Sequence, residues 1–276
     1  MRPLLLLCCL TCATLVLAQD HIRAKSFYVH WGYHRSHYQQ SDIHFKGDDF
    51  DFRLLDVRAH DDPSEFEADV YLHWQKFTVP QFNFRFGHFI TENSSISIGW
   101  DHMKYVMQRY QRVRIEGTVS ASFSEERARQ WNGERIDLNP SFLKYEHTDG
   151  LNYVRAAYER HIPFWQDKRE RFYLYALVGL SGGPVFTWSD ATVAQVRYRN
   201  WIHLAGWGVS GQLALRLRWK HGLYLQYQHH TGFIGLRDVI FMENQNRASQ
   251  NIRFNEQSIV LGAELPFFIG GNPNKE

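Results

Sequence analysis

Two histidines that adjoin carboxylates are the residues best suited to acid–base chemistry. Asp101 directly precedes His102, and the run Glu146-His147-Thr148-Asp149-Gly150 places a second histidine among acidic groups. General acid–base catalysis needs a histidine that a carboxylate orients and that lies close to a nucleophile. Thr148 or Ser141 could supply the hydroxyl. The weak catalytic candidates are therefore His102, His147, Asp149 and Asp101.

The second of these runs also has an ordinary structural explanation. Thr148-Asp149-Gly150 suits a tight turn before a strand, because Asp and Gly accept turn geometry easily. The sequence carries no nucleophile elbow, no HExxH motif and no paired-cysteine motif. A turn is the preferred interpretation, and catalysis here is the alternative.

Histidines and carboxylates also gather between residues 34 and 62. The candidate metal ligands in this stretch are His34, His37 and Asp48. Imidazole and carboxylate groups together can hold a divalent ion. Their spacing follows no fixed metal-binding pattern, so we prefer a solvated loop and expect neither a metal nor a cofactor.

The elements that would carry these residues are strands of alternating polarity. Residues 151–188 predict two long antiparallel strands joined by the charged turn QDKRE. Val154, Ala156 and Tyr158 share one face of the first strand, because side chains alternate between the two sides of a strand. A dozen or more residues exceed the usual soluble strand of about 5–6 residues. They match a tilted strand of about 9–11 residues that crosses a bilayer in a closed barrel.

The same alternation predicts six further strands and a regular order of connections. These strands span residues 27–33, 81–90, 96–106, 203–218, 223–232 and 256–268. The connections alternate between long and short, the long ones being 34–80, 107–149, 190–201 and 233–255. Outer-membrane barrels have an even strand number, short periplasmic turns and longer extracellular loops. The prediction is an all-β, transmembrane, antiparallel up-and-down β-barrel of eight strands with long extracellular loops.

Three β-like runs inside the long connections leave the strand number open. They span residues 51–57, 70–79 and 113–123, and they would give 10–12 strands if they entered the barrel. We interpret them as strand extensions and loop hairpins above the membrane. A soluble all-β domain is the other alternative, but it would need a second sheet to cover the apolar and aromatic faces.

The inward faces of the predicted strands carry a balanced set of charges. The predicted lumen network consists of Arg85, Asp101, Arg155, Glu159, Arg216, Glu264, Gln226 and His230. An eight-stranded barrel is just wide enough for side chains to fill its interior. Buried charges are tolerated when they are paired and hydrogen-bonded. Three positive and three negative groups therefore predict a plug of ion pairs, with a narrow path for a proton or solute as the alternative.

The composition and the N-terminus favour export. MRPLLLLCCLTCATLVLAQD has a positive start, an apolar core and a small-residue site after Ala18, which predicts a signal peptide over residues 1–18 and one barrel domain over 19–276. All three cysteines lie in this segment, so a disulfide scaffold is excluded for the rest. The formal net charge of the chain is only +2, which gives no reason to expect a nucleic-acid partner.

Three segments resemble an outer-membrane β-barrel family of Bacteroidota that lacks an assigned activity. They are SDIHFKGDDFDFRLLDVRAHD at 41–61, ISIGWDHMKYVM at 96–107 and FLKYEHTDGLNYV at 142–154. The resemblance covers nearly the whole chain after residue 18. It implies the barrel fold and a location in the bacterial outer membrane, and it brings no catalytic residues.

Three functions of different classes fit these observations. The first is a plugged outer-membrane barrel with a structural role, or with loops that bind or assemble with a protein partner. The second is a lipid-modifying hydrolase with its site at the outer rim, and the third is a narrow solute channel. In each case the expected surroundings are outer-membrane lipid and lipopolysaccharide.

Overall fold

The computed structural model describes residues 23–64, 67, 80–242 and 245–265. The predicted signal peptide and the predicted β-like run at 70–79 lie outside these residues. In the part of the chain that is described, no helix has the length and apolar character needed to cross a bilayer. The only helical element among these residues is a 3₁₀ turn at Glu125–Arg127.

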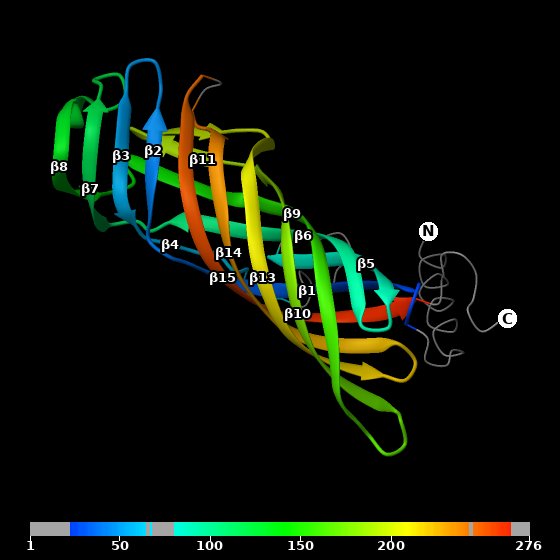
Figure 1. Ribbon diagram of the computed structural model, residues 1–276. Helices are drawn as coiled ribbons and strands as arrows, with labels where there is room; N and C mark the ends of the chain where they lie inside the picture. The colour runs from blue at the N-terminus through cyan, green and yellow to red at the C-terminus, as the bar shows by residue number, and fades with distance from the viewer. Residues whose placement is uncertain (1–22, 65–66, 68–79, 243–244, 266–276) are drawn as a thin grey trace.

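Eight antiparallel strands form a closed ring (Figure 1). The ring closes because β1 pairs with β5 on one side and with β15 on the other, for example Tyr33 with Phe82 and with Ile259. The eight ring strands, in spatial order, are β1 Phe27–Tyr38, β5 Phe82–Thr91, β6 Ser94–Met107, β9 Leu143–Gln166, β10 Phe172–Thr187, β13 His203–Trp219, β14 Leu223–Ile240 and β15 Arg247–Leu265. The predicted eight-stranded antiparallel barrel is confirmed, and the alternative of 10–12 ring strands is wrong.

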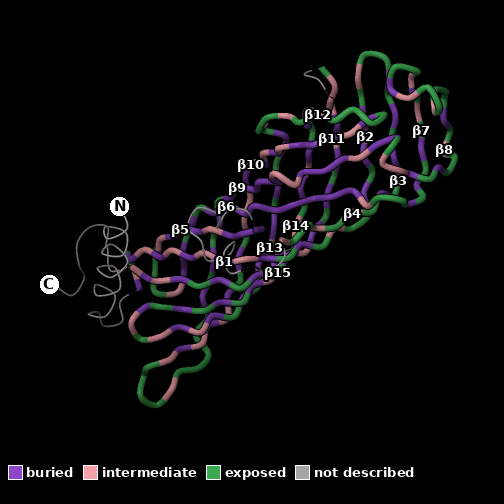
Figure 2. The backbone as a smooth tube through the Cα atoms, turned by 180° about the vertical axis from the view of Figure 1, so that it is seen from behind, coloured by how far each residue is buried: buried purple, intermediate pink, exposed green. Residues whose placement is uncertain are grey.

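The outward faces of the ring strands form an apolar belt. Buried and exposed residues alternate along these strands (Figure 2). The exposed fraction reaches 73% for Leu180, 65% for Ile98 and 64% for Leu213. A soluble protein cannot leave so much continuous apolar wall in water, whereas a bilayer core accepts it. The fold is therefore that of a transmembrane β-barrel.

The strands continue well beyond the predicted boundaries. Residues 233–255 were expected to be a loop, but β14 runs to Ile240 and β15 begins at Arg247. The pairing of these extensions brings Ile234 opposite Ile252, both of them buried. In this region the apolar side chains point inward and the polar ones outward, which is the reverse of the lipid-facing belt. The apolar face of the strand therefore switches from the outside to the inside of the barrel. The prediction of a loop is wrong.

The other long connections also contain strands. The beginning of β15 pairs with β2, and this pairing adds a four-stranded extension to the wall, here called the loop sheet. Its members are β2 Ser41–Lys46, β3 Asp51–Val57, β7 Gln111–Val119 and β8 Arg129–Leu138. Three short strands lie off this path: β4 Ala59–His60 pairs with β6, β11 Asp190–Val193 pairs with β9, and β12 Val196–Arg199 pairs with β11. The β-like runs at 51–57 and 113–123 thus lie outside the ring, as predicted.

An apolar core closes the upper end of the barrel beneath the loop sheet. Phe45 of the loop sheet has its ring centroid 5.4 Å from that of Tyr145 on β9 and 4.7 Å from that of Phe241. Phe50 and Phe123 pack edge to face at 4.8 Å in the same cluster. Burial of each such side chain contributes about 1.5–3 kcal/mol. The loop sheet is consequently fixed to the barrel and does not stand away from it.

Candidate functional site in the barrel lumen

Glu264 gathers three arginines at the lower end of the lumen. Its carboxylate lies 2.6 Å from Arg218 Nε, 3.1 Å from Arg23 Nε and 3.7 Å from an Arg216 terminal nitrogen. These side chains come from β13, β15 and the segment before β1, and all of them are buried. A buried charge is stable only when it is paired and hydrogen-bonded. Glu264 therefore joins distant parts of the ring through one carboxylate.

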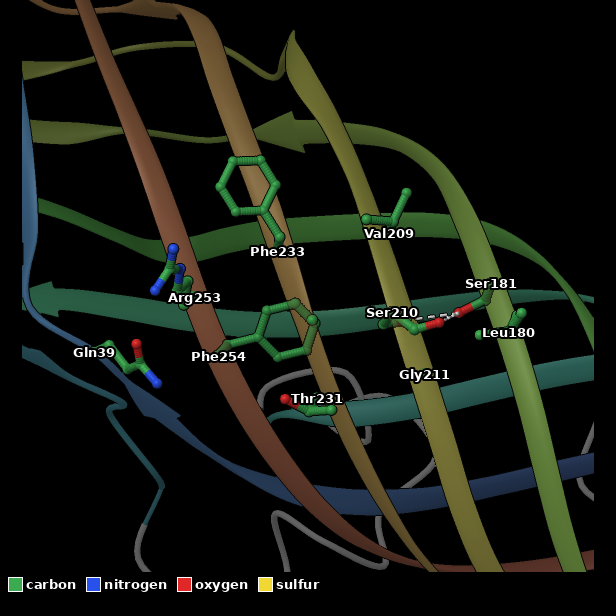
Figure 3. Close-up of a pocket in the computed structure, with 11 residues that line it drawn as sticks. Gln39, Leu180, Ser181, Val209, Ser210, Gly211, Thr231, Phe233, Arg253 and Phe254 are labelled. Carbon is green, nitrogen blue, oxygen red and sulfur yellow. Dashed lines mark hydrogen bonds between the residues drawn. The ribbon is translucent and has the colours of Figure 1, made fainter.

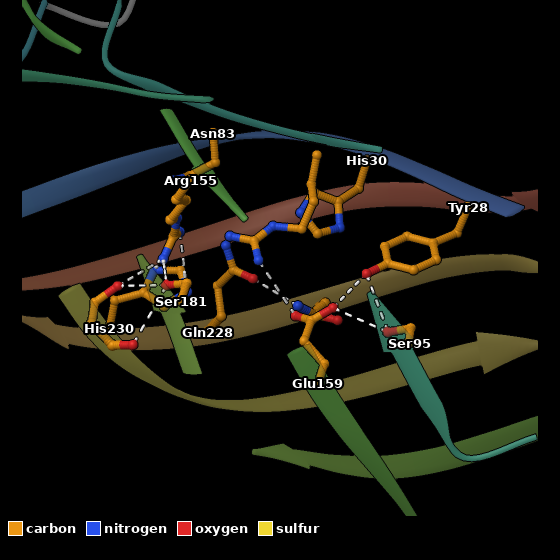
Figure 4. Close-up of polar contacts among 12 residues, drawn as sticks. Tyr28, His30, Asn83, Ser95, Arg155, Glu159, Ser181, Gln228 and His230 are labelled. Atoms are coloured by element: carbon orange, nitrogen blue, oxygen red, sulfur yellow. Dashed lines mark hydrogen bonds and ion pairs between the residues drawn. The ribbon is translucent and has the colours of Figure 1, made fainter. Parts of the chain in front are cut away.

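Glu159 occupies the next level of the lumen (Figure 4). It accepts hydrogen bonds from the Tyr28 hydroxyl and, at 3.4 Å, from the Ser95 hydroxyl. One Arg85 nitrogen lies 3.7 Å from the same carboxylate. Tyr28 lies flat across Gly87 of β5, where a Cβ would come within 2.2 Å of its ring. A glycine is needed at that position because the ring must reach across the lumen to Glu159.

A third level centres on Arg155 and two carboxylates. Arg155 Nε lies 2.6 Å from Asp101, and Asn83 donates hydrogen bonds to Asp101 at 2.6 Å and to Glu256 at 2.9 Å. His230 Nδ1 lies 3.1 Å from Glu256. Asn83 therefore connects the two carboxylates, and the charges of this level form one network.

All eight residues of the predicted lumen network lie inside the barrel and are buried. Besides the contacts above, Arg216 Nε donates to Gln226 at 2.7 Å, and Gln226 donates to Gln228 at 2.7 Å. The chain that links Arg216 to Gln228 runs along β13 and β14. Charged and amide groups thus fill the cross-section where an open pore would need water.

The eight predicted residues leave out further members of the network, among them Arg218, Glu256, His34 and Arg23. Arg218 and Glu256 obey the same alternation as Arg216 and Ser258, so extending the strand pattern would have found them. His34, 3.0 Å from Glu256, belongs to the part of β1 that was interpreted as loop. Arg23 precedes the first strand, so no alternation could place it in the lumen.

The four catalytic candidates do not converge on one site. His102 faces outward on β6, with its Nδ1 2.9 Å from Asn152 Oδ1 and its ring stacked on Phe82 at 5.3 Å. Asp149 forms an ion pair with Arg199 at 2.6 Å. Asp101 lies in the lumen on Arg155, as described above.

His147 has a hydroxyl partner that the sequence did not reveal. Its Nδ1 lies 3.0 Å from Ser189 Oγ, although the two residues are 42 positions apart. Burial lowers the pKa of His147, which lies above the lipid-facing belt, to about 3. A neutral histidine beside a serine could serve as a base, but both side chains are buried, and the His147 ring packs against Tyr105 and Tyr145. The pair gives a substrate no access.

The three candidate metal ligands lie apart. His34 is in the lumen on Glu256, His37 follows on the outward side of β1, and Asp48 is in the exposed turn between β2 and β3. Within the described ranges, no group of three or more His, Cys, Asp or Glu side chains is arranged to hold a metal ion.

Comparisons with known proteins do not identify a relative of this chain. No protein-family model matches the chain, and no curated protein matches it either. Among solved structures, the outer membrane protein OprG from Pseudomonas aeruginosa is 9% identical, with 90% of this chain and 98% of that one covered and a TM-score of 0.42. Neisserial surface protein A is 9% identical, with 87% of this chain and 97% of that one covered and a TM-score of 0.36. Ail of Yersinia pestis is 8% identical, with 85% of this chain and 99% of that one covered and a TM-score of 0.28. TM-scores this low do not establish a shared fold. The class of transmembrane β-barrel is therefore defined by the closed ring and its apolar belt alone.

Proposed function

We propose that the protein is a closed barrel of the bacterial outer membrane that presents the loop sheet at the cell surface for binding or assembly. The observation that supports the proposal is that the interior is closed in two regions. Ion pairs centred on Glu264, Glu159 and Arg155 fill the lumen, and the aromatic core beneath the loop sheet fills the upper end. A body closed in this way supports a structural or binding role better than transport.

The orientation follows from the lengths of the connections. The 91–94 and 219–223 turns are short and lie at the end of the barrel where Phe27 pairs with Leu265. The loop sheet lies at the opposite end (Figure 1). Short turns are periplasmic and long loops extracellular in outer-membrane barrels. Export through the predicted signal peptide, with cleavage after Ala18, belongs to the same proposal.

Cysteine labelling on intact cells tests this orientation. The chain has no cysteine after Cys12, so single-cysteine variants report one position each. We expect Asp48→Cys, in the exposed turn of the loop sheet, to react with a membrane-impermeant maleimide on whole cells. Lys168→Cys, in the exposed β9–β10 turn, should react only after the outer membrane is permeabilised. Labelling of Lys168→Cys alone on whole cells would refute the orientation.

A closed lumen also makes a prediction about conductance. The purified barrel, reconstituted in a planar bilayer, should give no conductance steps above the background of the empty membrane. The physical reason is that Arg155 and Asp101 form a buried ion pair and Asn83 connects Asp101 to Glu256, so an ion would have to break these buried contacts to pass. Reproducible steps that scale with protein concentration would contradict the closed body and favour the narrow channel.

The outer face of the loop sheet is the surface that a protein partner would meet. It carries charges of both signs, among them an exposed ion pair between Arg114 and Asp56 at 2.9 Å. The sheet ends at β8, for which the described residues provide no second neighbour. Unpaired edge strands accept an added strand unless charges oppose it. β8 carries Arg129, Glu134 and Arg135 on exposed positions, so a partner of mixed charge suits this face better than an apolar one.

A further inference from the structure

The outer wall of the barrel contains a groove that the plugged interior does not explain. It has a volume of about 590 Å³ and lies across β10, β13, β14 and β15 (Figure 3). Leu180 lies at one edge, and Gln39 and Arg253 lie at the opposite edge. Val209 and Phe233, both on outward-facing positions, stand along its length.

The groove is hollow because its floor lacks a side chain. A Cβ built on Gly211 would meet only Leu180 Cδ2, at 4.0 Å, so there is open space above this residue. Ser181 and Ser210 belong to the same region, but their hydroxyls bond to each other at 2.7 Å and to Arg155 in the lumen at 3.1 Å. These two hydroxyls are thereby drawn inward. Thr231 remains as an outward-facing hydroxyl of the lining, and the part between Leu180, Val209 and Phe233 is suited to a hydrocarbon chain.

One end of the groove is cationic. Arg253 is exposed, and none of the ion pairs found among the described residues includes it. The Gln39 backbone N–H donates to the Arg253 carbonyl at 3.0 Å, which fixes the end of β1 against β15. The groove therefore combines an apolar channel with a positive end on a rigid part of the wall.

A second arginine approaches the same end from above. Gly235 pairs with Trp207 on one side and Asn251 on the other. The atom nearest to the position that a Gly235 Cβ would occupy is Phe233 Cε1, at 3.4 Å, followed by Asn251 Oδ1 at 3.7 Å and Arg237 Nε at 3.9 Å. The neighbouring Asp238 is engaged by other groups, accepting from Arg247 at 2.6 Å with His203 at 2.9 Å. Arg237 therefore lies over Gly235 beside the Phe233 ring, and Phe233 pairs with Arg253 on the neighbouring strand.

The height of these two arginines matches the upper lipid interface. Trp207, which is 64% exposed, stands beside Gly235 on the outer wall. Tryptophan is enriched where the hydrocarbon core of a bilayer meets its head groups. The arginines are consequently placed where lipid head groups lie, and the groove at Gly211 is placed within the hydrocarbon layer.

We propose that this groove binds one phosphorylated lipid of the lipid A type from the outer leaflet. An acyl chain lies over Gly211 between Leu180 and Phe233, and the phosphate binds Arg253 at the end of the groove, with Arg237 beyond Phe233 as a second cationic group. Planar guanidinium groups bind phosphate through paired, charge-assisted hydrogen bonds, and their charge complements that of the lipid. The choice of an outer-leaflet lipid rests on the proposed orientation of the barrel.

Native mass spectrometry of the full-length, detergent-solubilised barrel tests the site. With bis-phosphorylated lipid A added, we expect one lipid to stay bound under conditions that remove detergent and phosphatidylcholine. Arg253→Gln should reduce the bound fraction roughly tenfold, because it removes a charged hydrogen-bond donor from the phosphate. Gly211→Leu should reduce it similarly by filling the groove.

Matched variants separate the site from general effects. Arg112→Gln removes an exposed arginine from the loop sheet, and Ala263→Leu enlarges an outward residue of the lower belt. Both should bind lipid A like the unmodified protein, and all variants should keep the heat-dependent gel shift of a folded barrel. Equal retention of phosphatidylcholine, or unchanged binding by Arg253→Gln and Gly211→Leu, would overturn the site. Binding is measured on purified protein, so labelling that refutes the orientation would leave this result intact.

Discussion

Replacement of Glu264 by Gln is expected to lower the free energy of unfolding by about 3–5 kcal/mol. The substitution keeps the shape of the side chain and removes its charge. Arg218, Arg216 and Arg23 would then face each other in the lumen without the carboxylate that they share. Removing one partner of a buried ion pair is costly because the remaining charge stays out of water. Three guanidinium groups depend on Glu264, so this position should be the most sensitive in the lumen.

Urea unfolding of the barrel in lipid vesicles, followed by tryptophan fluorescence, measures this effect. Glu126→Gln is the matched control, because that side chain is 79% exposed and should change stability by less than about 0.5 kcal/mol. Gel mobility before and after boiling reports in parallel whether each variant forms the barrel. A loss below about 1 kcal/mol for Glu264→Gln would mean that water or another group compensates the arginines.

The ring could be predicted from sequence because its two environments differ so strongly. Along β13, Leu213 and Leu215 face lipid while Gln212 and Arg216 face the lumen. This contrast predicts both the presence of the strand and which of its faces is turned to lipid. Above the belt the contrast reverses, since Ile234 and Leu236 point into the apolar core. A strand whose apolar side switches from outward to inward looks irregular in sequence. For this reason the sequence predicts loops for the upper third of the barrel.

The lumen residues could be predicted individually, but their partners could not. Alternation shows that Arg85 and Glu159 point inward, but it does not show that they meet. Which inward residues face each other depends on the stagger of strands around the ring, and this is set by closure of the whole barrel. The contact between Arg23 and Glu264 joins residues 241 positions apart and includes one residue outside any strand. The groove at Gly211 is similarly invisible in sequence, because it depends on four strands and an absent side chain.

The ion pair between Arg155 and Asp101 should show a large coupling energy in a double-mutant cycle. Arg155→Met and Asp101→Asn are each expected to cost about 3–5 kcal/mol, since each leaves its partner charged and buried without the ion pair that the two groups form at 2.6 Å. The double variant removes both charges together, so it should cost less than the sum by about 2–3 kcal/mol.

The exposed pair between Arg114 and Asp56 supplies the comparison for this cycle. It has the same residue types at 2.9 Å, but its side chains are 47% and 59% exposed. Arg114→Met and Asp56→Asn should therefore couple by about 0–1 kcal/mol, because water screens the charges. Unfolding of the six variants and the unmodified barrel under one set of conditions gives both coupling energies. Equal values would show that the lumen is wet enough to screen its charges, and the closed interior on which the proposed function depends would be refuted.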